Sequence, residues 1–160
     1  MVRVTPDPLD PAEEEVWRRL AMLLLLVPRA LEDDLQRGAG LSLTHYTVLL
    51  HLSEAPGRSL RMSDLALRAS ISPSRMTRVV QHLERQGWVT RCGSEDDRRA
   101  YLARLTDAGL ARLEAAWPTH LASVRRLVVD HLDHAHLPAL ATALDAIVAE
   151  AMSDGCASDD

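Results

Sequence analysis

Apolar residues recur every three or four positions along the first part of the chain, which predicts one long helix from Pro11 to about Gly40. Met22, Leu24 and Leu25 add a second apolar face to this helix. A helix with so much apolar surface needs more than one neighbour to cover it, so a contact with a second chain is expected. The repeating positions are Val16, Leu20, Leu23, Val27 and Leu31.

Three shorter helices are predicted next. The first is capped by Ser42 or Thr44 and ends near the Pro56-Gly57 turn. The second covers residues 62–69. The third begins at Ser72-Pro73, a preferred cap followed by a preferred first-turn proline, and ends near residue 87. Its buried stripe is expected to contain Met76, Val79, Val80 and Leu83.

Two segments that alternate between apolar and polar residues, 88–92 and 100–105, predict a β-hairpin with a charged tip. A long helix from Thr106-Asp107 to about residue 128 follows, and another begins at Pro138. This order predicts a mainly α fold with a small β-hairpin wing, namely a winged helix-turn-helix plus a helical dimerisation region. Residues 41–105 would form the DNA-binding domain, and 11–40 with 106–152 the dimerisation region. Residues 1–10 and 153–160 would be flexible tails.

Composition limits the class of protein. The chain has 160 residues and is 47% apolar, which suffices for a folded domain, and it contains neither Phe nor Lys. Two cysteines form no disulfide framework, so a cytoplasmic location is expected. The apolar run from Leu20 to Val27 is far shorter than the roughly 20 residues of a membrane span. No membrane association is therefore predicted.

The charge is divided unevenly along the chain. The net charge is -5, yet residues 58–104 hold ten arginines and five acidic residues. Because a phosphate backbone responds to the local field, this segment is expected to bind double-stranded DNA in spite of the overall charge.

The third of the short helices has the composition of a DNA-reading element. Arginine can bind guanine through two hydrogen bonds in the major groove, and hydroxyls at a helix amino end can hold phosphates. An arginine at a hairpin tip can enter the minor groove, oriented by a carboxylate. The alternatives are a solvated helix face and a polar turn. The candidate DNA-binding residues are Ser72, Ser74, Arg75, Thr77, Arg78 and His82 on the helix, and Asp97, Arg98 and Arg99 in the wing.

Three segments resemble the MarR family of winged-helix regulators: residues 72–89, Asp-Asp-Arg-Arg at 96–99 and Leu-Thr-Asp-Ala-Gly at 105–109. The resemblance covers about residues 11–152 and implies an obligate homodimer. It implies that Arg78 is a recognition-helix arginine and that Arg99, oriented by Asp97, is the minor-groove arginine. Where many members have a further arginine, this chain has His82, whose DNA contact would be weaker or dependent on pH.

The resemblance also implies a regulator, expected to be a repressor, that a small molecule releases from a pseudopalindromic operator. Such effectors are often phenolic or anionic. The candidate lining residues are Trp17, Arg18, His45, Tyr46, Trp117 and His120, with core or interface packing as the alternative for the aromatic ones. A urate-responsive branch is suggested by Trp17 and residues 116–121, but Thr47 stands where that branch has an acid. Urate is therefore not expected.

Other functions are weighed against this one. Cys92 beside Arg91 suggests redox sensing, with an incidental thiol as the alternative. His131, His134 and His136 do not share one helical face, so a solvated connector is preferred to a metal site, and no metal or cofactor is predicted. A winged helix used only for protein contacts remains open. No phosphate loop or nucleophile elbow is present, so an enzyme is not expected.

Overall fold

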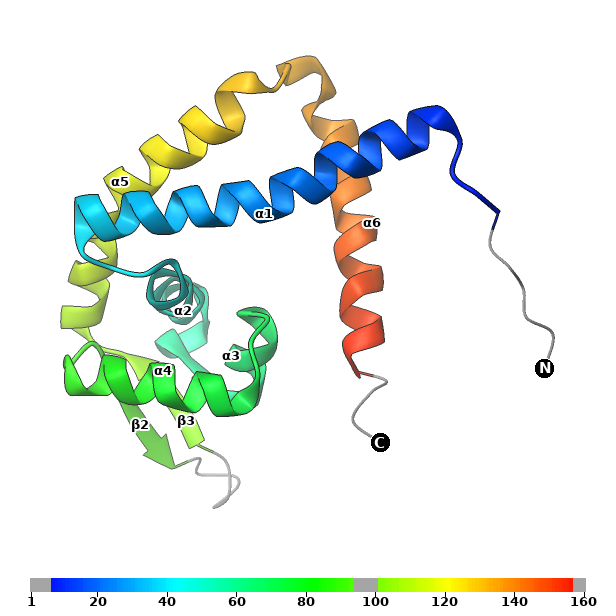
Figure 1. Ribbon diagram of the computed structural model, residues 1–160. Helices are drawn as coiled ribbons and strands as arrows, with labels where there is room; N and C mark the ends of the chain where they lie inside the picture. The colour runs from blue at the N-terminus through cyan, green and yellow to red at the C-terminus, as the bar shows by residue number, and fades with distance from the viewer. Residues whose placement is uncertain (1–6, 94–100, 157–160) are drawn as a thin grey trace, which may run out of the picture. The chain divides into compact units, whose positions relative to one another are not determined.

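The computed structural model describes residues 7–93 and 101–156, and helices dominate both parts (Figure 1). The expected mainly α fold with a small sheet is confirmed. In chain order the elements are α1 (Pro11–Ala39), α2 (Leu43–Glu54), the 3-10 turn η1 (Pro56–Arg58), β1 (Ser59–Arg61), α3 (Met62–Arg68), α4 (Pro73–Arg85), β2 (Val89–Gly93), β3 (Tyr101–Leu105), α5 (Asp107–Leu127), the 3-10 turns η2 (Val129–His131) and η3 (His134–His136), and α6 (Leu137–Cys156).

Both ends of α1 are fixed by local chemistry. The Asp10 carboxylate accepts hydrogen bonds from the backbone N–H groups of Ala12 and Glu13, and the Glu13 carboxylate accepts one from Asp10 N at 2.8 Å. This reciprocal cap satisfies amides that have no partner within the helix. Gly40, with φ 58°, ends the helix, and the helix continues through Pro28. The predicted bounds of this helix are confirmed.

The caps of α2 and α4 follow the same logic. Ser42 Oγ accepts a hydrogen bond from His45 N at 3.1 Å, which settles the choice between Ser42 and Thr44. Ser72 Oγ accepts one from Arg75 N at 3.3 Å, and the first residue of α4 is a proline, as predicted. Both short helices therefore begin at the residues that the sequence indicates.

The sheet has one strand more than the predicted hairpin. β2 pairs antiparallel with β3, from Val89 opposite Leu105 to Gly93 opposite Tyr101. β1 lies on the other side of β3, with Ser59 opposite Arg104. Three residues are too few to show an alternating pattern, so β1 has no signal of its own in the sequence. Its backbone hydrogen bonds come from β3, which lies more than 40 positions away in the chain.

A single apolar core joins the carboxyl end of α1 to α2, α3, α4, the sheet and the first half of α5. The predicted stripe of α4 is part of it. The buried core residues are Leu35, Leu41, Tyr46, Val48, Leu49, Leu52, Ala55, Leu60, Leu65, Ala66, Met76, Val79, Val80, Leu83, Val89, Ala103, Leu105, Leu113 and Ala116.

The junction between the hairpin and α5 explains why Leu-Thr-x-x-Gly occurs at 105–109. Thr106 Oγ1 donates to the carbonyl of Gly87 at 2.7 Å and accepts from Gly109 N at 3.0 Å. A β-carbon at position 109 would collide with the Trp88 carbonyl oxygen, so only glycine lets the first turn of α5 pack this closely. The motif therefore fixes where the sheet meets α5.

The described residues form two compact units, which divide between Ser123 and Val124. In the second, Arg125 pairs with Asp130 at 2.6 Å, and the Asp133 carboxylate accepts from Ala135 N at 2.9 Å. α6 extends to Cys156, into the segment expected to be a tail. Ser, Asp and Gly lower helix stability by only about 1 kcal/mol or less per residue, which does not end a helix whose backbone bonds continue.

Most of α6 is apolar and exposed within the described chain. The stretch His134–Met152 has a mean hydropathy of 1.2 and, by length and composition alone, could cross a membrane. Asp145 lies near the middle of this stretch, where a charge in hydrocarbon is costly. Contact with another protein surface explains this exposed apolar face of α6 better than a membrane does.

Candidate nucleic-acid interface

Helix α4 presents two chemically different faces. Met76, Val80 and Leu83 have no exposed surface, whereas Arg75 and Arg78 are exposed on the opposite side. Neither arginine forms an ion pair with any residue in the described ranges 7–93 and 101–156, so both guanidinium groups are available to a ligand. A helix held by its buried stripe and carrying free arginines outward has the form needed to enter a major groove.

The hydroxyls at the amino end of α4 are partly used by the protein. Ser72 Oγ holds Arg75 N and lies 3.2 Å from Ser74 Oγ. Thr77 Oγ1 donates to the carbonyl of Pro73 at 3.0 Å. Ser72 and Thr77 therefore stabilise the first turn, and all three side chains remain exposed at the amino end of α4.

Ion pairs leave fewer unpaired arginines in residues 58–104 than the sequence count suggests. Arg91 binds Glu84 at 2.8 Å, and Arg58 binds Asp107 at 3.0 Å. These pairs join residues 7 and 49 positions apart, so the sequence gives no sign of them. Among the described residues of this segment, the arginines without an ion pair are Arg75, Arg78 and Arg85 on α4 and Arg61, Arg68 and Arg104 on β1, α3 and β3.

His82 does not project freely from α4. Its ring stacks on that of His45 from α2, with centroids 4.6 Å apart and planes 3° from parallel. Both side chains are half-buried. Burial, and then the neighbouring His82, lower the pKa of His45 below its ordinary value of 6.5, while the Glu32 carboxylate acts to raise it. The sequence indicated His82 as a DNA contact and His45 as an effector contact, and the structure places the two together.

The wing tip, with Asp97, Arg98 and Arg99, lies outside the described residues. Its base is described: β2 and β3 form a regular antiparallel pair next to the carboxyl end of α4. The minor-groove role of the wing therefore stays a prediction.

Three of the predicted effector residues converge between α2 and α5. The ring centroids of Tyr46 and His120 are 4.3 Å apart, and those of Trp117 and His120 are 6.2 Å apart. Tyr46 Oη and His120 Nδ1 are buried without a hydrogen-bond partner among the residues that the structure describes. Such unpaired polar atoms cost stability, and an ordered water or a bound ligand would satisfy them.

The electrostatics keep both groups neutral near physiological pH. Burial, assisted by the negative charge of Glu54, raises the pKa of Tyr46 to about 12. Burial lowers the pKa of His120 below 6.5. The phenol is thus a hydrogen-bond donor, and the imidazole Nδ1 donates or accepts according to its tautomer.

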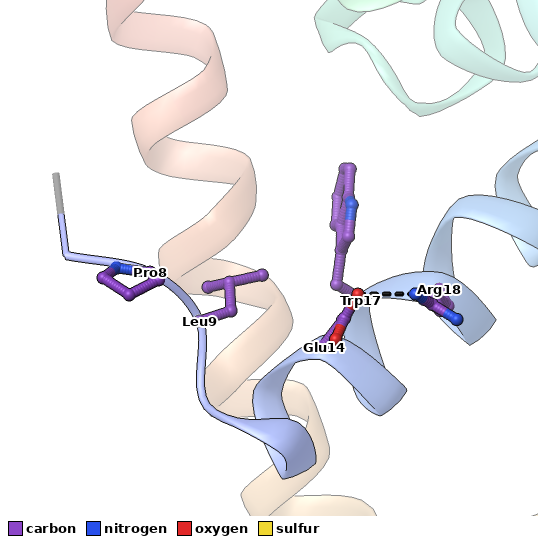
Figure 2. A pocket seen from close by; sticks show the side chains of 5 residues that line it. All are labelled: Pro8, Leu9, Glu14, Trp17 and Arg18. Atoms are coloured by element: carbon purple, nitrogen blue, oxygen red, sulfur yellow. Dashed lines mark hydrogen bonds and ion pairs between the residues drawn. The ribbon is translucent and has the colours of Figure 1, made fainter.

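Trp17 and Arg18 are not part of this cluster. They lie at the amino end of α1, beside a hollow of about 460 Å³ lined with Pro8, Leu9 and Glu14 (Figure 2). Arg18 pairs with Glu14 at 2.6 Å, and Trp17 is 54% exposed. Trp17 precedes the core residue Leu35 by 18 positions, or about 27 Å along a helix. Within a single chain, Trp17 and Arg18 therefore lie apart from Tyr46, Trp117 and His120.

The residues behind the redox and metal alternatives have ordinary surroundings. Cys92 is half-buried in β2, opposite Leu102. His131 Nε2 lies 3.0 Å from the carbonyl oxygen of Arg126, and His136 Nδ1 lies 3.3 Å from Asp133. In the described part of the chain no three His, Cys, Asp or Glu side chains are grouped to hold a metal ion.

Comparisons with known proteins agree with this geometry. Sco3205 of Streptomyces coelicolor, a MarR family transcriptional regulator whose crystal structure contains DNA, is 37% identical to the chain; the match covers 93% of this chain and 92% of Sco3205, with a TM-score of 0.83. AbsC, a regulator of the same family and organism, is 36% identical over 92% of this chain and 99% of its own, with a TM-score of 0.84.

Sequence comparison gives the same assignment. The HTH-type transcriptional repressor YetL of Bacillus subtilis is 30% identical over 96 residues, which is 60% of this chain and 58% of YetL. The chain thus spans about three fifths of the length of the curated relatives it matches. The sequence profile of the MarR family matches residues 39–100, from the end of α1 through β2 to the residue before β3. The chain is therefore a member of the MarR family.

Proposed function

We propose that this protein is a dimeric, sequence-specific transcriptional repressor that inserts α4 into the major groove. The observation that carries the proposal is α4 itself, a helix fixed by a buried stripe that presents unpaired Arg75 and Arg78 to solvent. The DNA in the crystal of Sco3205, 37% identical over nearly the whole chain, supports the assignment. Arg78 would bind a guanine edge, and Ser72, Ser74 and the helix amino end would bind phosphates.

Dimerisation is supported by apolar surfaces that the described chain leaves exposed. On α1 the run from Met22 to Leu26 is 50–75% exposed. On α6, Leu140, Leu144 and Ile147 are 38–52% exposed. Continuous apolar faces of this kind mark protein contacts, and a second copy of the chain is the partner that also matches two symmetric DNA half-sites.

Release by a small aromatic effector is supported by the Tyr46–His120–Trp117 cluster. A phenol or aromatic carboxylate entering between α2 and α5 would pair with Tyr46 Oη and His120 Nδ1, which the described residues leave without partners. The effector would stabilise one arrangement of α2 relative to α5, and α2 also packs on α4. Differential binding to two arrangements is what lets an effector change DNA affinity.

The DNA-binding proposal predicts a steep dependence on salt. In fluorescence anisotropy, the wild-type protein should bind the DNA that flanks its own gene far more tightly than a scrambled fragment. The logarithm of the binding constant should fall linearly with the logarithm of salt concentration, because the arginines displace counterions from the phosphates. A winged helix that serves only protein contacts would show neither selectivity nor this salt dependence.

Replacing Tyr46 by Phe should separate stability from effector response. Removing a buried, unpaired hydroxyl should leave the free energy of unfolding unchanged or raise it by up to about 1 kcal/mol. Release from DNA by 4-hydroxybenzoate or a related aromatic acid should need higher concentrations. Urea unfolding and anisotropy measure the two effects, and Tyr101→Phe, which changes a 61% exposed tyrosine of β3, is the matched control. A destabilised Tyr46→Phe variant with a normal response would contradict the assignment.

A further inference from the structure

The stacked imidazoles of α2 and α4 join two helices that the proposed function uses in different ways. We propose that His45 is a positioning residue that holds the His82 ring for contact with DNA, and that the stacked pair takes up one proton when the operator binds. This inference rests on the proposed DNA-binding function. It adds to that function a residue outside α4 and a dependence on pH.

The stacking geometry supports the positioning role of His45. A histidine on a helix surface has several rotamers, and a ring 4.6 Å away and only 3° from parallel selects one of them. His82 follows Arg78 by four positions and Arg75 by seven, so its Cβ lies on the same side of α4 as the two free arginines. In the described part of the chain no protein hydrogen bond engages the ring nitrogens of His45 or His82, which leaves them available to a base or phosphate.

His45 is itself held in place by the cap of α2 and by the contact of α2 with α1. Its backbone N–H donates to Ser42 Oγ at 3.1 Å, within the cap of α2. The backbone N–H of Leu43, the residue after Ser42, donates to the Glu32 carboxylate of α1 at 2.6 Å. The first turn of α2 is thus fixed to α1 while the His45 ring supports α4. A shift between α1 and α2 would therefore reach the His82 ring.

The charges around the pair limit it to one proton. Glu32 from α1 is the acidic group that acts on His45. On α4, Arg78 and Arg85 lie one turn before and after His82, and both are positive. Two protonated rings stacked at 4.6 Å would repel each other, so a second proton is strongly disfavoured. In the free protein, burial further favours the neutral form of His45.

Bound DNA shifts the protonation equilibrium of the stacked pair toward the charged form. Phosphates bring negative charge to the face of α4, which favours the charged form of an imidazole in contact with them. A complex that holds one more proton per protomer than the free protein becomes tighter as pH falls, by about tenfold per pH unit for each fully coupled proton. Operator affinity should therefore rise as the pH is lowered from 8 toward 6.5.

Operator affinity should be measured above about pH 6.5, because the lowered pKa of His45 makes the fold less stable at lower pH. Its pKa is lower in the folded chain than in the unfolded one, so the unfolded chain binds more protons below 6.5. The free energy of unfolding is therefore fully retained above about pH 6.5 and decreases as the pH falls further. Binding measurements above this value report DNA contacts rather than loss of fold.

Calorimetry of the full-length protein with operator DNA, in two buffers of different ionisation enthalpy, counts the protons taken up. At pH 7 the wild type should take up protons, and His82→Gln should take up markedly fewer while still binding DNA through its arginines. His51→Gln, a change on α2 away from the stack, is the matched control and should match the wild type. Equal uptake by wild type and His82→Gln would overturn the proposal.

Substitutions at His45 test positioning separately from titration. His45→Phe retains a ring that can stack but not titrate, so it should lose less operator affinity than His45→Ala and keep most of the proton uptake. Equal losses for Phe and Ala would overturn the positioning role. Selective binding by the wild type without proton uptake would defeat this inference alone, whereas a wild type that binds no DNA would defeat the proposed function as well.

Discussion

Replacing both Leu24 and Leu25 by glutamate should convert the protein from a dimer into monomers. The two side chains are 62% and 75% exposed in the single chain and belong to the longest apolar run of α1. If a second copy covers this run, the change buries four unpaired carboxylates per dimer, and each costs several kcal/mol unless it stays in water. The dimer dissociation constant should rise by at least about a hundredfold, and tight operator binding should be lost with it.

Light scattering coupled to size-exclusion chromatography measures this outcome directly. Leu67→Glu is the matched control, because Leu67 is a 50% exposed leucine on α3, away from the apolar run of α1. It should leave the mass of the dimer unchanged. If the Leu24/Leu25 double variant remained dimeric, the apolar run of α1 would not be the dimer contact, and a wild-type monomer would contradict the dimer proposal itself.

Replacing Arg78 by alanine should weaken operator binding by about 1–3 kcal/mol per half-site, or about 5- to 150-fold. The side chain is exposed and has no ion-pair partner among the described residues, so its removal should barely change the free energy of unfolding. Anisotropy with operator DNA measures the affinity, and chemical denaturation measures the stability. Loss of affinity together with loss of stability would point to a structural role instead.

Local chemistry explains why much of this fold could be predicted. The Ser72-Pro73 start of α4, the Gly40 end of α1 and the Leu-Thr-x-x-Gly junction each act within a few residues, and the structure confirms them. The three-residue strand β1 could not be predicted, because its backbone pairs with β3, far along the chain. Propensity and periodicity carry no information on such a pairing.

The sequence predicted the parts of the candidate site that lie on one helix, but not those that depend on contacts between helices. The face of α4 follows from helical spacing, since Arg75 and Arg78 lie opposite residues that must be buried. The stack of His82 on His45 depends instead on how α2 crosses α4, and the separation of Trp17 from Tyr46 depends on the length of α1. Contacts between elements of this kind appear only once the chain is folded.

A base-substitution profile of the operator shows whether α4 reads base sequence through Arg78. Each base pair of one half-site is replaced in turn, and the affinity of every variant DNA is measured with wild type, Arg78→Ala and the charge-matched control Arg29→Ala. Arg78→Ala should lose the preference at one base pair, a guanine contact, and keep the wild-type profile elsewhere, while Arg29→Ala should keep the whole profile. An Arg78→Ala profile parallel to that of the wild type at every position would show that Arg78 does not read base sequence.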